Sequence, residues 1–272
     1  MNFVELLKVV LLGVVEGVTE WLPISSTGHM LLVDEFISLD MSENFKEMFF
    51  VVIQFGAILA VLNIFWEKLS PIQISGSLGL NKSAIMIWLK VAVACIPTGI
   101  LGFLLDDYLE EHFGTASTIA IMLIVYGVAF IMVENWNKKR SPIMDTVADI
   151  HYSIAFLLGI FQSLAMIPGT SRSGATILGA LLLGISREAA VEFSFFLVIP
   201  TMLGASLYKL AKFGLAFSNA EVISLALGMA VAFFVSLIVI RLLMKYVERN
   251  DFKVFGWYRI LLGGIILALY AL

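Results

Sequence analysis

The chain has 272 residues, of which 60% are hydrophobic and 14% charged, and its formal net charge at pH 7 is -4. Its mean hydropathy of +0.99 implies more apolar surface than a soluble domain can bury, which excludes a water-soluble fold. The charge gives no reason to expect nucleic acid as a partner. The lone Cys95 excludes an internal disulfide. We therefore expect a single membrane domain over residues 1–272, surrounded by membrane lipid.

The first apolar region, residues 3–36, is interrupted in its middle by the segment WLPISSTGHM. Spanning a bilayer takes about 20 consecutive apolar residues, and a broken helix at membrane depth is tolerated only where it is buried in protein or lines a wet cavity. The pattern predicts a re-entrant hairpin of two short helices. Residues 152–183, interrupted by MIPGTSRSGAT, predict a second one.

Six uninterrupted apolar runs are long enough to cross the membrane. They follow the hairpins in two groups of three, at 47–66, 84–105 and 116–134, and at 189–210, 219–244 and 256–272. The predicted fold class is an all-α polytopic membrane protein.

The two halves of the chain resemble each other. The tripeptide LLG occurs at 11–13 and at 157–159, and each copy precedes a proline and a Ser-x-x-Gly segment, at 25–28 and 171–174. We expect one repeat over about 1–140 and another over about 141–272, each a hairpin plus three spans. Three spans are an odd number, so the second repeat enters the membrane from the opposite side, which predicts an inverted-topology pair.

The distribution of lysine and arginine predicts the orientation. If Lys138, Lys139 and Arg140 are cytoplasmic, the remaining basic loops fall on the same side, and the acidic loops at 34–47 and 106–111 fall on the external side with both chain ends. The first hairpin then opens outward, the second opens inward, and their tips meet near the midplane.

Ionisable residues inside these hairpins need a reason, because each costs about 2.5 to 3.5 kcal/mol to insert. Glu16 and Glu20 are four residues apart on a predicted helix, so their carboxylates share one face. Two such carboxylates could hold a divalent cation together with substrate phosphate oxygens, or could simply face a wet crevice. Gln54 is a weaker candidate that could also point inward.

The hairpin turns carry residues suited to an anion. Helix starts with hydroxyls and free N–H groups bind phosphate, which favours Ser25, Ser26 and Thr27 in the first turn and Ser171 and Ser173 in the second.

Two further residues stand beside those hydroxyls. His29 could act as a general acid or base. Arg172 could grip two phosphate oxygens, or could instead form a buried clamp with Glu16 or Glu20. Together the residues predict a phosphate site with a metal at the repeat interface. The same broken, inverted repeats are also typical of secondary transporters. A secondary transporter or a lipid flippase therefore remains the alternative function.

The segments Glu16–Glu20, Leu22–His29 and Pro168–Thr176 resemble the two signature segments of the bacterial undecaprenyl-diphosphate phosphatases, or bacitracin-resistance proteins. The resemblance covers essentially the whole chain. It implies hydrolysis of a polyprenyl diphosphate lipid, undecaprenyl diphosphate, to undecaprenyl phosphate and inorganic phosphate, which recycles the lipid carrier of peptidoglycan synthesis. It also implies bacitracin resistance, a divalent cation (Mg²⁺ or Ca²⁺), and a site in the bacterial plasma membrane that opens to the external side.

Carried over by position, the resemblance assigns Glu16 and Glu20 to the acidic, metal-binding motif. It assigns Ser26, Thr27 and His29 to one phosphate loop and Ser171, Arg172 and Ser173 to the other. We expect catalysis to depend on Glu20, Ser26, His29 and Arg172. Ser26 is the candidate nucleophile with His29 as its base or acid; a metal-activated water, or His29 itself, fits the same residues. The sequence leaves the oligomeric state open, including a homodimer.

Overall fold

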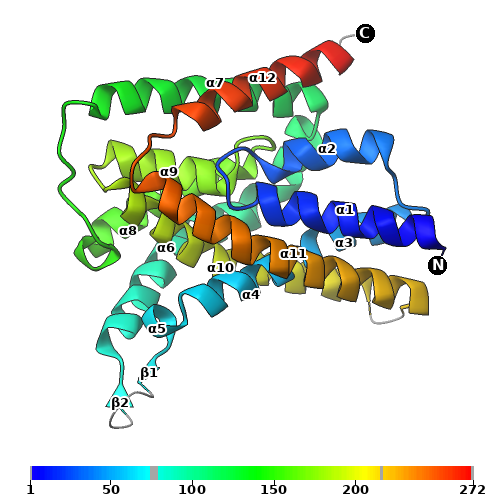
Figure 1. Ribbon diagram of the computed structural model, residues 1–272, viewed down its shortest axis with the longest axis horizontal. Coiled ribbons are helices and arrows are strands. Elements are labelled where there is room, and N and C mark those ends of the chain that lie inside the picture. Colours follow the sequence, from blue (N-terminus) through cyan, green and yellow to red (C-terminus); the bar gives the residue numbers. More distant parts are fainter. Residues whose placement is uncertain (1, 74–78, 215–216, 271–272) are drawn as a thin grey trace.

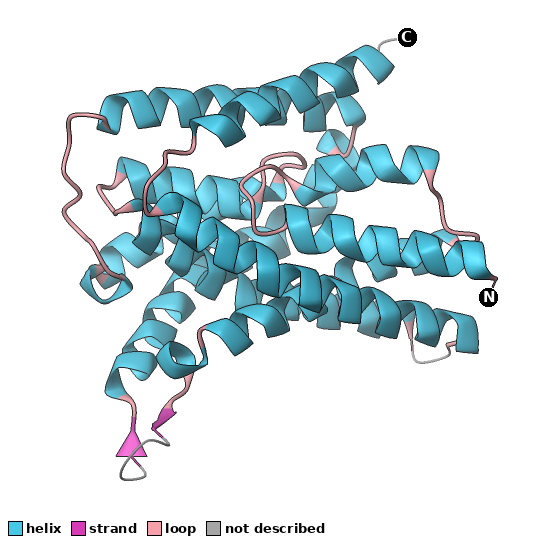
Figure 2. Cartoon of the chain, in the orientation of Figure 1, coloured by secondary structure: helices cyan, strands magenta, loops and turns pink. Residues whose placement is uncertain are grey.

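The computed structural model describes residues 2–73, 79–214 and 217–270. Apart from one small hairpin of β1 (Ile72–Gln73) and β2 (Gly79–Leu80), its regular elements are helices (Figure 2). Six helical segments are long and apolar enough to cross a membrane. The expected all-α polytopic membrane fold is confirmed.

The six spans agree with the predicted runs to within a few residues. They are α3 with α4 (Glu43–Val52 and Gln54–Ile64), the part Lys82–Leu105 of α6 (Lys82–Phe113), α7 (Ala116–Asn137), α10 (Arg187–Phe213), α11 (Asn219–Val247) and α12 (Lys253–Tyr270). The last two residues of the predicted final span, 271 and 272, lie outside the described residues. Short helices complete the chain at α5 (Trp66–Leu69) and η1 (Val147–Asp149).

Both predicted hairpins consist of two short helices. The first pairs α1 (Phe3–Thr19) with α2 (Ser26–Phe36), and the second pairs α8 (Tyr152–Ser163) and η2 (Leu164–Met166) with α9 (Arg172–Leu182). At 1.5 Å per residue, α2, α8 and α9 are each about 16 to 18 Å long, too short for a hydrocarbon core of about 30 Å.

The turns of the two hairpins meet inside the molecule. In Figure 1 the loops before α2 and α9 lie together near the centre, and the two helices run away from them in opposite directions. The N- and C-terminal ends lie on one side of the view, and the loops after α7 and α11 lie on the other. Which of these sides is external remains a prediction. The inverted relation of two whole repeats remains a prediction.

Glycines let each hairpin approach a spanning helix closely. A Cβ on Gly13 of α1 would lie 2.9 Å from the carbonyl oxygen of Gly228 in α11, and one on Gly159 of α8 would lie 2.0 Å from that of Ala94 in α6. Contacts between small residues replace the hydrophobic effect as a source of helix association within a bilayer. The LLG tripeptides of the sequence are therefore packing motifs.

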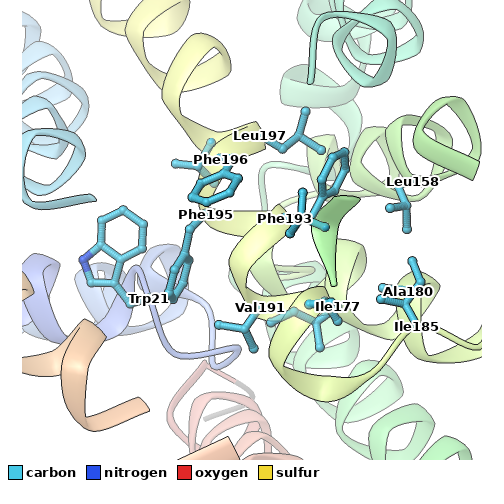
Figure 3. Close-up of a cluster of buried hydrophobic side chains, with 14 of the residues drawn as sticks. Trp21, Leu158, Ile177, Ala180, Ile185, Val191, Phe193, Phe195, Phe196 and Leu197 are labelled. Atoms are coloured by element: carbon cyan, nitrogen blue, oxygen red, sulfur yellow. The ribbon is translucent and has the colours of Figure 1, made fainter. Parts of the chain in front are cut away.

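The core lies around α10. Phe193, Phe195 and Phe196 are completely buried, and Trp21, in the turn of the first hairpin, packs edge-on against Phe195 with ring centroids 5.0 Å apart (Figure 3). In the second hairpin α9 is buried, with Ile177 fully enclosed, whereas one face of α8 is exposed at Phe156 and Ile160. The hairpin turns are thus held in a packed interior.

Candidate active site

The turn before α2 is closed by Ser25. This residue has a φ of 72°, a left-handed conformation that is unusual for a side chain other than glycine, and its Oγ accepts a hydrogen bond of 3.4 Å from the N–H of Gly28. Ser26 and Thr27 therefore form the first turn of α2. Their N–H groups are at a helix start, where no intrahelical carbonyl can accept from them.

The turn before α9 repeats this geometry. Ser171 has a φ of 73°, and its Oγ accepts from the N–H of Gly174 at 3.2 Å and lies 3.2 Å from the hydroxyl of Ser173. Gly169 has a φ of 92°. Two strained serines at equivalent places are costly, and such strain is typical of functional sites. The structure thus has both of the predicted helix N-termini, and each is capped by a serine.

Glu20 joins the two turns. Its Oε1 accepts from Nη2 of Arg172 at 3.1 Å, and its Oε2 accepts from Oγ of Ser26 at 2.8 Å. Its backbone carbonyl accepts from Oγ of Ser173 at 3.4 Å. One carboxylate therefore contacts a hydroxyl of the first turn and a guanidinium of the second. The predicted clamp between Arg172 and a glutamate is present, and it places the candidate nucleophile beside the same glutamate.

Gln54 completes the surroundings of Arg172. It begins α4 directly after the break at Ile53, and its Oε1 accepts from Nη2 of Arg172 at 3.0 Å. The weak candidate of the sequence therefore does point into the site. Two protein oxygens thus hold Nη2 of Arg172, whereas no acceptor among the described residues contacts its Nε or Nη1, which leaves both for an anion.

Glu16 lies one helical turn before Glu20 and is 1% exposed. Its Oε1 is buried and has no hydrogen-bond partner among the described residues. A buried carboxylate oxygen without a partner costs free energy, which a bound cation would offset. The described residues contain no group of three His, Cys, Asp or Glu side chains that could hold a metal. Glu16 and Glu20 therefore fit only the kind of cation site that substrate oxygens complete.

His29 is directed toward α12. Its Nδ1 lies 2.7 Å from the carbonyl oxygen of Ser25, and its Nε2 lies 2.7 Å from the hydroxyl of Tyr258, whose ring is parallel to the imidazole. Because the carbonyl can only accept, Nδ1 carries a proton, and in the neutral imidazole Nε2 then accepts from the hydroxyl of Tyr258. The structure therefore pairs Ser26 with Glu20 and pairs His29 with a residue that the sequence analysis missed.

A second missed residue, Arg259, follows Tyr258. It is completely buried within a membrane span and donates to the backbone of both turns. The sequence contained a signal for Arg259, because a charged side chain inside an apolar run is costly to insert into a membrane. Its presence requires a structural or functional explanation, as that of Arg172 does. Thr27, by contrast, is exposed at the start of α2.

The fold and the site together define a polytopic helical membrane protein whose chemical groups converge between two re-entrant hairpins. A family model described as bacitracin resistance protein BacA matches residues 9–265, and the chain belongs to this family.

Several curated relatives match the chain over nearly its whole length. The chain is 61% identical over 274 residues to an undecaprenyl-diphosphatase of Enterococcus faecalis, a match that covers 100% of this chain and 99% of that protein. It is 55% identical to an undecaprenyl-diphosphatase of Desulfitobacterium hafniense (100% and 98% covered) and 50% identical to one of Streptococcus thermophilus (97% and 93% covered).

Proposed function

We propose that this protein is an integral membrane phosphatase that hydrolyses undecaprenyl diphosphate to undecaprenyl phosphate and inorganic phosphate. The observation that carries the proposal is the contact of one carboxylate, Glu20, with both Ser26 and Arg172 between two serine-capped helix starts. The names of the relatives agree with it. The reaction returns the lipid carrier to peptidoglycan synthesis, and removal of the diphosphate that bacitracin sequesters gives resistance.

The diphosphate lies where the N-terminal ends of α2 and α9 face each other. Free N–H groups and the positive ends of the two helix dipoles favour an anion there. Nε and Nη1 of Arg172 hold phosphate oxygens, while Glu20 and Gln54 fix the plane of the guanidinium. Phosphoryl transfer depends mainly on such positioning and charge neutralisation.

Ser26 is the nucleophile in this proposal, and Glu20 is its base. Oγ of Ser26 already donates to Oε2 of Glu20 at 2.8 Å, a distance suited to proton transfer. Oγ attacks the terminal phosphorus, the bond to the bridging oxygen breaks, and undecaprenyl phosphate leaves with the proton from Glu20. Water then attacks the phosphoserine, gives its proton to Glu20, and releases phosphate as Ser26 regains a proton.

His29 supports the first turn in this scheme, since its Nε2 is occupied by Tyr258. The alternative in which His29 is the nucleophile requires that hydrogen bond to break. Glu16 and Glu20 would hold a divalent cation, Mg²⁺ or Ca²⁺, which would neutralise charge on the diphosphate.

The location of the site is also part of the proposal. The positive-inside distribution supports an opening to the external side of the plasma membrane, with the polyprenyl tail leaving sideways into lipid. A homodimer is compatible with this arrangement, and light scattering in detergent tests it.

The primary test is phosphate release from undecaprenyl diphosphate by purified protein in detergent, with and without EDTA. Arg172→Ala and Glu20→Ala should each abolish release, whereas Arg241→Ala, on the exposed face of α11, should not. Loss of activity with EDTA and its return with Mg²⁺ or Ca²⁺ would support the metal. No release from well-folded wild-type protein would overturn the phosphatase and favour the transporter, to be tested by lipid movement in sealed vesicles.

A further inference from the structure

Arg259 of α12 is a cation at the centre of a membrane protein, and it is completely buried. Its Nη1 donates to the carbonyl oxygen of Pro23 at 3.1 Å, and its Nη2 donates to those of Gly169 at 3.0 Å and Thr170 at 2.9 Å. Pro23 belongs to the turn before α2, and Gly169 and Thr170 belong to the turn before α9. One guanidinium therefore contacts the backbone of both turns.

The charge of Arg259 is not paired with a carboxylate. None of the ion pairs in the described part of the chain includes it, whereas Arg172 pairs with Glu20 and Arg187 with Glu134. A buried charge without a counter-ion is costly and persists only when hydrogen bonds satisfy it. Here backbone carbonyls do so, and the guanidinium lies 5.5 Å from the centre of the Tyr126 ring.

The helix that carries Arg259 is fixed to its neighbour. A Cβ on Gly256 would lie 2.7 Å from the carbonyl oxygen of Gly127 in α7, and one on Gly263 would lie 2.6 Å from that of Ala120. Arg259 also donates to the Leu123 carbonyl of α7, at 3.4 Å. The α7 and α12 pair is therefore a rigid base from which the side chain reaches the turns.

We infer that Arg259 is a positioning residue that sets the distance between the two phosphate-binding turns. Pro23 lies three residues before Ser26, and Thr170 lies two residues before Arg172. The carbonyls that Arg259 holds are thus directly joined to the segments that carry the nucleophile and the anion-binding guanidinium. Nη1 also lies 3.1 Å from the position of a Cβ on Gly174, at the start of α9.

The expected loss of activity rests on the proposed function, whereas the link between the two turns rests on the structure alone. The guanidinium donates its hydrogen bonds to backbone carbonyls, so Arg259 does not itself bind the substrate. Without it, each turn keeps its own serine cap, but the link between the turns is reduced to Glu20. A displacement of about 1 Å between reacting groups can lower the rate about 100-fold.

The test compares Arg259→Met, Arg259→Lys and the control Arg241→Met. Methionine keeps a long apolar stem and removes every donor, whereas lysine keeps the charge and can donate to part of the carbonyl set. In the phosphate-release assay, kcat per folded molecule should fall about 100-fold in Arg259→Met with a smaller change in KM, and Arg259→Lys should recover part of it. Arg241→Met should retain wild-type kinetics.

Amide hydrogen exchange distinguishes a residue that positions the two turns from one that only stabilises the whole fold. In Arg259→Lys, residues 20–28 and 166–174 should exchange faster together, while α1 and α11 keep their wild-type protection. Uniformly faster exchange, or unchanged kcat per folded molecule, would overturn the inference. If Arg259→Met does not fold, the lysine variant decides by the same two criteria. If wild-type protein releases no phosphate, the proposed function fails, and the exchange result still decides whether Arg259 joins the turns.

Discussion

Glu20 has two roles at the residue scale, because it is both the partner of Arg172 and the acceptor for Ser26. Glu20→Gln keeps the shape and one acceptor oxygen but cannot take a proton. We expect kcat to fall about 100-fold or more with KM changed less, as for the loss of a general base. Phosphate release across a substrate series measures both constants. Activity near the wild-type level in this variant would exclude Glu20 as the base.

The identity of the nucleophile is a second prediction at this scale. Brief reaction with substrate labelled on its terminal phosphate, followed by acid quenching, should leave label on the wild-type protein. Ser26→Ala should carry none, because its methyl group cannot attack phosphorus, and His29→Ala should still be labelled, since His29 is turned toward Tyr258. Label that survives in Ser26→Ala and vanishes in His29→Ala would reverse the assignment.

At the element scale, substitutions of Ser171, the strained serine that caps α9, separate two contributions to stability. Ser171→Ala loses the cap, which costs about 1 kcal/mol, and keeps a φ of 73° that alanine tolerates poorly. Ser171→Gly loses the same cap but adopts that φ without strain. The glycine variant should therefore melt at a higher temperature than the alanine variant in detergent. The reverse order would mean that the turn is not held at this φ.

Gly169, in the second turn, and Gly204, in α10, should respond oppositely to substitution by alanine. A Cβ on Gly169 would lie 2.5 Å from the carbonyl oxygen of Ile119, and its φ of 92° disfavours any other side chain, so Gly169→Ala should cost about 2 kcal/mol or more. Apart from the neighbouring backbone of its own helix, no described atom lies within 4 Å of a Cβ on Gly204 of α10, so Gly204→Ala should be neutral or stabilising by about 0.5 to 1 kcal/mol. Thermal melts of the two variants in one detergent make the comparison.

At the scale of the whole molecule, the predicted orientation can be tested by cysteine labelling. With Cys95 replaced by alanine, Asn44→Cys should react in intact cells with a membrane-impermeant maleimide, and Lys139→Cys should react only after the membrane is opened. Both native side chains are exposed; Asn44 lies in the first turn of α3, and Lys139 lies in the turn that follows α7. The opposite pattern would mean that the first hairpin opens to the cytoplasm, and it would remove the external site from the proposal.

The sequence by itself determined the membrane class, the six spans and the two broken helices. These follow from local composition, since run length and interruptions by proline, glycine and serine are properties of short segments. It also identified Glu16, Glu20, Ser26 and Arg172, because charges and hydroxyls inside apolar runs need an explanation wherever they occur.

Only the tertiary structure decided which of these groups meet. The contacts of Glu20 with Arg172, of His29 with Tyr258 and of Arg259 with both turns join residues separated by 152, 229 and up to 236 positions along the chain. No local pattern encodes such pairings. They depend on how α12 packs against α7 through glycines and how the buried turns of the two hairpins meet, and that packing directs His29 away from Ser26 and toward α12.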